Sequence, residues 1–184
     1  MLRDPQTRVE FRRNASAGFS LIELLITVSI ILIIAAIAIP NFLRSKLVAN
    51  EASAVQNLRN ITTAVAIYNE TWDNGYPPAL SSLGGTGTLA TCDQSNLVDP
   101  VLSTAPYTKS GYVLGYAGKG GTVAVGQGCG NPGFWRYLIT AAPQSKGLTG
   151  NRSFCSDSQG VIHYDYSGLP AGSESACEAL TALQ

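Results

Sequence analysis

Apolar residues follow one another almost without a break in residues 19–39, which read FSLIELLITVSIILIIAAIAI. The only polar positions in this stretch are Ser20, Glu23, Thr27 and Ser29. A helix of this length is about 30 Å long at 1.5 Å per residue, which matches the hydrocarbon core of a bilayer. The pattern therefore predicts a membrane-spanning helix over 19–39, surrounded by lipid or by sister helices.

Beyond residue 40 the pattern becomes amphipathic. Apolar residues recur mostly at steps of three, four or seven, at Leu43, Leu47, Val48, Val55, Leu58, Ile61, Val65 and Tyr68. Polar residues occupy the other faces, at Arg44, Lys46, Glu51, Gln56, Asn57 and Arg59. This spacing predicts that the helix continues over 40–71 and that its apolar stripe packs on a globular domain.

The helix is expected to stop at residues 73–75, Asp-Asn-Gly, because Asn-Gly favours a left-handed turn, and Pro77 and Pro78 follow. Residues 72–184 are rich in Gly and Pro and contain candidate strands at 112–116, 123–125, 134–142, 152–156 and 161–166. The turn-rich residues 157–160 between the last two strands predict a hairpin. The expected class is α+β, with an antiparallel sheet laid against the second half of the helix.

Charge is sparse and unevenly distributed. The 184 residues contain 12 Lys and Arg against 12 Asp and Glu, and charged residues make up 13% of the chain. This balance argues against a nucleic-acid binder held by phosphate contacts. Four arginines precede the apolar run, in residues 1–18, and only Arg44 and Lys46 follow it closely. The positive-inside rule therefore places residues 1–18 in the cytoplasm and the rest beyond the membrane.

Three interpretations of residues 19–39 compete. A secretory signal peptide has an apolar region of about 7 to 15 residues before a small-x-small site, which Ala36 and Ala38 imitate, but this run is longer. An uncleaved anchor is the second possibility. Neither explains Glu23, because an acidic residue in a membrane helix raises the free energy of insertion.

The third interpretation accounts for the carboxylate. Residues 18–23, GFSLIE, followed by the apolar run and Pro40, resemble the N-terminus of type IV pilins and of type II secretion pseudopilins. That family has a basic leader ending in Gly, an aromatic first mature residue, Glu at mature position five and a later Pro. Gly18, Phe19, Glu23 and Pro40 fill these places, and the resemblance is close over 15–71 and fades afterwards.

The resemblance implies a cleavage by prepilin peptidase after Gly18, which removes residues 1–18, and methylation of the new amine on Phe19. Glu23 would then pair with the Phe19 amine of a neighbouring copy during assembly, and Pro40 would kink the helix. The implied division is a leader over 1–18, a membrane and filament-core half over 19–39, an amphipathic half over 40–71 and an exported head over 72–184.

The four cysteines are Cys92, Cys129, Cys155 and Cys177, all beyond the membrane span. An even number in an exported, loop-rich domain favours disulfides, and four cysteines allow three pairings. The resemblance favours Cys155 with Cys177, since pilins often close a C-terminal loop this way, which leaves Cys92 with Cys129. A zinc site is disfavoured, because there is no C-x-x-C spacing and only one His.

Motifs for catalysis or cofactor binding are not recognisable. The Gly-rich segments match no phosphate-binding or dinucleotide pattern, and His163 lies in an alternating strand pattern. Some pseudopilins bind calcium, but Asp157 and Asp165 form no EF-hand loop. We therefore expect no enzyme activity, no cofactor and no metal.

The resulting expectation is a structural subunit of a type IV pilus-like filament, used for adhesion, motility or DNA uptake. Its expected partners are prepilin peptidase, copies of itself, the inner-membrane assembly machinery and lipid, with no nucleic acid bound by specific contacts. It would lie in the inner membrane as a precursor, with a periplasmic head, and in a surface pilus or periplasmic pseudopilus after assembly. Two alternatives stay open: a major pseudopilin of type II secretion, and a monomeric membrane-anchored binding domain with Gly- and Ser-rich recognition loops.

Overall fold

A computed structural model describes residues 18–126 and 128–183. Of the leader expected over 1–18, all but Gly18 therefore lies outside the described residues. One helix, α1 (Leu21–Trp72), takes up the first part and includes Pro40. The chain divides into two compact units, with the boundary between Asn41 and Phe42. The first unit holds the apolar half of α1, and the second holds the rest of α1 and the sheet.

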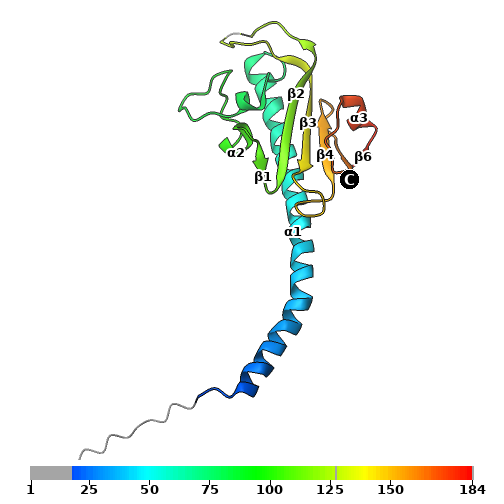
Figure 1. Ribbon diagram of the computed structural model, residues 1–184. Coiled ribbons are helices and arrows are strands. Elements are labelled where there is room, and N and C mark those ends of the chain that lie inside the picture. Colours follow the sequence, from blue (N-terminus) through cyan, green and yellow to red (C-terminus); the bar gives the residue numbers. More distant parts are fainter. Residues whose placement is uncertain (1–17, 127, 184) are drawn as a thin grey trace, which may run out of the picture. The chain divides into compact units, whose positions relative to one another are not determined.

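The second unit contains a six-stranded antiparallel sheet in which each strand pairs with the next along the chain. The strands are β1 (Thr108–Lys109), β2 (Tyr112–Thr122), β3 (Phe134–Pro143), β4 (Ser153–Asp157), β5 (Ile162–Asp165) and β6 (Thr181–Ala182). The C-terminal part of α1 lies on one face of this sheet (Figure 1). The expected α+β class, a long helix followed by an antiparallel sheet, is confirmed.

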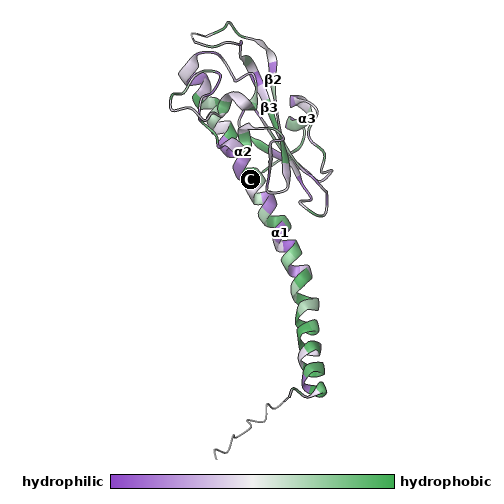
Figure 2. Ribbon diagram, turned by 60° about the vertical axis from the view of Figure 1, so that its left-hand side comes forward, coloured by the Kyte–Doolittle hydropathy of each residue, from purple (hydrophilic) through white to green (hydrophobic). Residues whose placement is uncertain are grey.

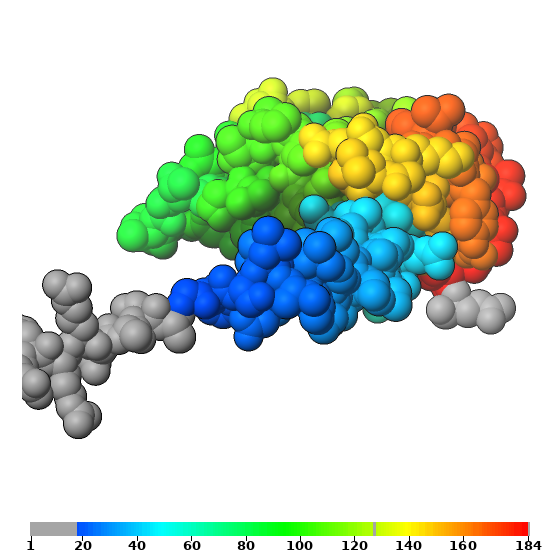
Figure 3. Space-filling view, turned by 60° about the horizontal axis from the view of Figure 1, so that its bottom comes forward, coloured from blue at the N-terminus to red at the C-terminus, as the bar shows by residue number. Residues whose placement is uncertain are grey.

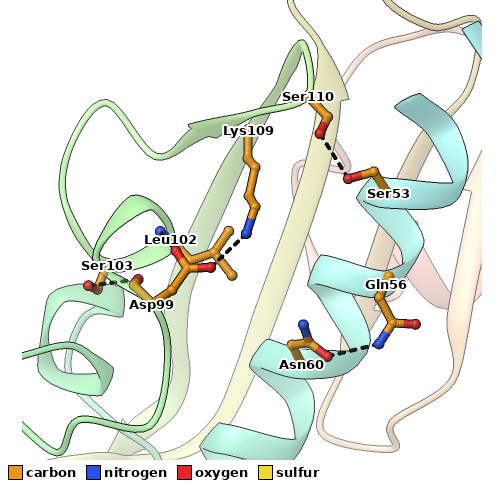
Figure 4. Close-up of polar contacts among 8 residues, drawn as sticks. All are labelled: Ser53, Gln56, Asn60, Asp99, Leu102, Ser103, Lys109 and Ser110. Atoms are coloured by element: carbon orange, nitrogen blue, oxygen red, sulfur yellow. Dashed lines mark hydrogen bonds and ion pairs between the residues drawn. The ribbon is translucent and has the colours of Figure 1, made fainter. Parts of the chain in front are cut away.

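Three short helices complete the unit and are not apparent in the sequence pattern: η1 (Leu80–Leu83), α2 (Pro100–Ser103) and α3 (Glu174–Glu178). Each is too short to show a hydrophobic period. The Asp99 side chain caps α2 by accepting from Leu102 N, and it also accepts from Lys109 Nζ at 2.6 Å (Figure 4). The hydrogen bond from Lys109 lowers the pKa of Asp99.

One predicted strand is wrong. Residues 123–125 are not a strand, and β2 instead continues to Thr122 through the glycines at 118, 120 and 121. The reason is pairing: Lys119 lies opposite Arg136 of β3, and the ladder tolerates a shift in register between Lys119 and Thr122. Glycine weakens a strand in isolation, but a long partner such as β3 overrides that preference. The hairpin expected around 157–160 is present, between β4 and β5.

The apolar stripe of α1 enters the core only in its later part. Leu58, Ile61, Val65 and Tyr68 are fully buried against the sheet, whereas Leu43 and Val48 are at least half exposed. The expectation that the whole stripe packs on the head is therefore wrong for its first members. Hydropathy along the helix shows the same change, from mostly apolar turns to mixed ones (Figure 2).

Two disulfides hold the loops of this unit. Cys92 is bonded to Cys129 across 37 residues, and Cys155 to Cys177 across 22 residues. These are the pairs that the resemblance favours. The second bond ties α3 and the C-terminal segment to β4, on the sheet face opposite α1, where Leu138 packs beside it. A bond that closes a loop of this length typically stabilises the folded state by about 2–4 kcal/mol.

A buried ion pair fixes α1 to the loop between β3 and β4. Glu51 is only 6% exposed, and its carboxylate accepts from Asn151 N at 2.8 Å, Arg152 N at 3.2 Å and Arg152 Nε at 2.8 Å. The Arg152 guanidinium also lies over the rings of Phe154 and Tyr164. The space-filling view shows the yellow β3–β4 loop against the cyan part of α1 (Figure 3). Glu51 is thus a buried anchor, not the solvent-facing residue that its polarity suggested.

Neighbouring groups extend this contact. Asn50 Nδ2 donates to Thr149 O at 2.9 Å, and the Ser53 and Ser110 hydroxyls lie 2.9 Å apart (Figure 4). Tyr112 donates its hydroxyl proton to Arg152 O at 2.8 Å. Burial, and to a smaller extent the Glu51 carboxylate, raises the pKa of Tyr112. Residues 50–53 of α1 therefore contact both the β3–β4 loop and the turn between β1 and β2.

We expect Glu51→Ala to destabilise the head by about 3 kcal/mol, because it leaves the Arg152 guanidinium and two backbone N–H groups without their acceptor. Urea unfolding of the full-length chain in detergent, followed by the fluorescence of Trp72 and Trp135, measures this change. Arg59→Ala is the matched control, since Arg59 is exposed on the same helix, and it should shift the free energy of unfolding by no more than about 0.5 kcal/mol. Equal stability of the two variants would contradict the anchoring role.

Candidate assembly site

The residues singled out for processing and assembly lie at the start of α1. Gly18, Phe19 and Ser20 precede the first helical residue, Leu21, and Phe19 is 84% exposed. The backbone N–H of Ser20 donates to Glu23 Oε2 at 3.0 Å, and Leu24 N donates to Ser20 O. This is one half of a capping box, in which the residue at N3 binds the N–H of the cap residue. The Glu23 carboxylate also lies at the positive end of the helix dipole.

The capping contact gives Glu23 a role within its own helix. The signal was present, because Ser20 and Glu23 have the S-x-x-E spacing of a capping box. The contact also fixes where the carboxylate lies: it is held beside the backbone nitrogen one residue after Phe19. Cleavage after Gly18 would create an amine on Phe19, close to this carboxylate in sequence.

The other polar side chains of the apolar half are satisfied within the helix. Thr27 Oγ1 donates to Leu24 O at 2.8 Å, and Ser29 Oγ donates to Leu25 O at 2.7 Å. Neither hydroxyl therefore requires water or a partner. Glu23 is the one charged side chain among the described residues from 18 to 41, and it is the group whose environment changes most on transfer between lipid, water and protein.

The apolar half of α1 has no cover of its own. Apart from Ala35, which is half-buried, every described residue of 18–41 is exposed, including Leu21, Ile22, Ile33, Ile34 and Ile37. The helix is long and apolar enough to cross a membrane by length and composition. An exposed apolar surface of this extent marks a membrane or protein interaction site.

Pro40 lies within α1, and the helix continues on both sides of it. Proline has no N–H, so the carbonyl four residues earlier, that of Ala36, lacks its usual helical donor. A kink at this position stays a prediction.

Gly18 has open space around it. A Cβ built on this residue meets no atom within 4 Å, and its φ is outside the left-handed region. The chain's own packing therefore does not require glycine here. A requirement for glycine would have to come from another molecule that approaches the backbone closely.

Comparison with known proteins singles out the same segment. A family model described as a prokaryotic N-terminal methylation motif matches residues 13–39. The chain carries a type IV pilin-like methylation motif. The long helix followed by an antiparallel sheet gives this pilin-like chain an α+β architecture. No solved structure matches the chain.

One curated relative shares this region. The chain is 51% identical over 57 residues to the type IV major pilin protein PilA of Myxococcus xanthus (strain DK1622). The match covers 31% of this chain and 26% of the relative, so it spans about a quarter of the relative's length. The similarity therefore concerns the N-terminal region, and the head is described by its own structure.

Three other candidate residues named from the sequence belong to the sheet. His163 is on β5, with its Nδ1 3.9 Å from the sulfur of Cys177. Asp157 is buried at the end of β4, and Asp165 ends β5. In the described part of the pilin-like chain, no three His, Cys, Asp or Glu side chains gather as they would around a metal ion.

Proposed function

We propose that the pilin-like chain is a prepilin that is cleaved after Gly18, methylated on Phe19 and polymerised through α1 into a type IV pilus-like filament. The observation that supports this most directly is the methylation motif at 13–39, followed by an apolar helix with no cover. A lone exposed helix of this kind is covered first by lipid, then by α1 of other copies. The head, residues 72–184, would lie outside the membrane.

The energetics favour assembly through Glu23. In a bundle of apolar helices an unpaired carboxylate is costly, and a nearby ammonium group offsets the cost. A copy whose Glu23 meets the methylated amine of a neighbour gains this compensation, whereas a copy alone in lipid does not. The partners are then prepilin peptidase, copies of the chain and the inner-membrane assembly machinery.

A surface pilus is favoured over a secretion pseudopilus by one observation: the 51% identity over 57 residues to a protein named as a type IV major pilin. The two disulfides are compatible with both locations, since the cell surface and the periplasm are both oxidising. In the alternative, the same processing would lead to a short periplasmic filament of type II secretion.

Intact-mass measurement on filaments sheared from the cell surface tests the proposal. The mature chain should lack residues 1–18 and carry one additional methyl group on Phe19. The same sample from cells without prepilin peptidase should contain no filament protein. A full-length mass in peptidase-competent cells would contradict the proposed processing, and mature protein found only in the periplasm would favour the pseudopilus.

A further inference from the structure

The C-terminal end of α1 concentrates negative charge. Glu70 lies in the last turn, Asp73 follows the helix directly, and the last turn contains no basic residue. The helix dipole is negative at this end, so both carboxylates are placed where a cation is favoured. Among the described residues, neither carboxylate has a hydrogen bond or ion pair. No residue in the described part of the chain therefore compensates this charge directly.

The backbone at Asp73 is held in a conformation that non-glycine residues rarely adopt, with φ of 45°. Such a residue is maintained only where its surroundings determine it. Here Asn74, which is fully buried, accepts from Gly126 N at 2.8 Å and donates to Asn131 O at 3.1 Å. These bonds fix the turn, and they keep the Asp73 carboxylate at the surface.

Asp73 also lines a pocket of about 400 Å³. It is lined by Asn69, Asp73, Gly75, Tyr76, Val123, Ala124, Phe134 and Trp135. Trp135 is 65% exposed, so much of its indole is available to a ligand. The faces of aromatic rings attract cations, and tryptophan does so most strongly.

The walls of the pocket are joined to one another before any ligand arrives. Tyr76 N donates to Phe134 O at 2.8 Å, and Phe134 N donates to Tyr76 O at 2.9 Å. The Tyr76 ring also packs edge-on against Tyr137, with centroids 4.7 Å apart. A preformed pocket loses little conformational entropy on binding.

We propose that this pocket binds an organic cation, an alkylammonium or guanidinium group, between the Asp73 carboxylate and the Trp135 ring. A free amine and the side chain of Arg44 or Lys46 from another copy both offer this chemistry. Arg44 and Lys46 are exposed on α1. The site does not depend on the proposed filament, because a single copy contains all of its residues.

The test uses the full-length chain in detergent micelles, titrated with tetramethylammonium chloride and with arginine amide while sodium chloride is held at equal ionic strength. The backbone amide resonances of Ala124 and Phe134 should shift and saturate. Asp73→Asn and Trp135→Leu should each weaken binding roughly threefold to thirtyfold. Asp93→Asn removes an exposed carboxylate that does not line the pocket, and it should leave affinity unchanged. Shifts reproduced by sodium chloride, or equal weakening by the Asp93 variant, would overturn the proposal.

A second arm identifies the source of the cation. Solid-state spectra of assembled filaments record the same two amides in the wild type and in the variant Arg44→Gln with Lys46→Gln. If the resonances of these amides differ between wild-type and variant filaments, the bound cation is a side chain from another copy. If they shift in both samples when tetramethylammonium is soaked in, the site takes a free cation. An amide that does not respond in micelles or in filaments would refute the site, whereas missing filaments would count only against the proposed function.

Discussion

Glu23→Ala should remove the protein from sheared surface fractions while leaving it in the membrane. The substitution takes away the only charge in the apolar half of α1. The helix becomes more stable in lipid and loses the group that, in the proposed filament, compensates a neighbour's amine. A loss of about 1.4 kcal/mol at the contact between copies lowers the association constant tenfold. The expected effect is at least this large. Immunoblots of sheared and membrane fractions measure the distribution.

The capping contact makes a second variant informative. Glutamine at position 23 can still accept from Ser20 N, because Gln serves in a capping box as Glu does. Glu23→Gln therefore keeps the local hydrogen bond and removes only the charge. Loss of filaments in both variants identifies the charge as the assembly group. Filaments at the wild-type level in the Gln variant would show that Glu23 acts by capping its own helix.

Gly18→Val should block processing nearly completely, with the cleaved fraction reduced by at least about tenfold. A β-branched side chain keeps the peptidase's catalytic groups away from the backbone and restricts the backbone on the leader side of the bond. The block cannot be attributed to misfolding of the described chain, since a Cβ at Gly18 meets nothing within 4 Å. Intact mass distinguishes the precursor, which retains residues 1–18, from the mature form.

The head offers a matched control for this experiment. Gly172 likewise has no atom within 4 Å of a built Cβ, and its φ is not in the left-handed region. Gly172→Val therefore makes the same chemical change in open space, far along the chain from the cleavage site. It should be processed like the wild type. A processing defect in both variants would mean that valine acts through folding or export and not at the peptidase.

The sequence predicted the N-terminal half better than the head. The apolar helix is defined by its length and composition and is visible without a structure. The roles of Gly18, Phe19 and Glu23 in processing and assembly stay predictions. Helix α1 and its end near Asp73 follow from periodicity and from turn residues. The hairpin between β4 and β5 was likewise signalled by residues 157–160.

The head depends on contacts between distant residues, which a pattern does not show. Glu51 and Asn57 were assigned to polar faces of α1, yet both are buried. Glu51 is buried because Arg152, about a hundred residues later, brings it an ion pair. The extension of β2 through its glycines depends in the same way on β3. The pocket at Asp73 joins three segments, and the sequence gives no sign that they meet.

The sequential order of the strands also determines how the head can fold. Each strand after β1 pairs with the strand that precedes it in the chain, so every new ladder closes a short loop. Low sequence separation between contacts favours rapid folding. If the proposed topology holds, the head can therefore form its sheet hairpin by hairpin as the chain is exported, while α1 is held in the bilayer. The disulfide between Cys155 and Cys177 would close last, after the emerging sheet has reached β5.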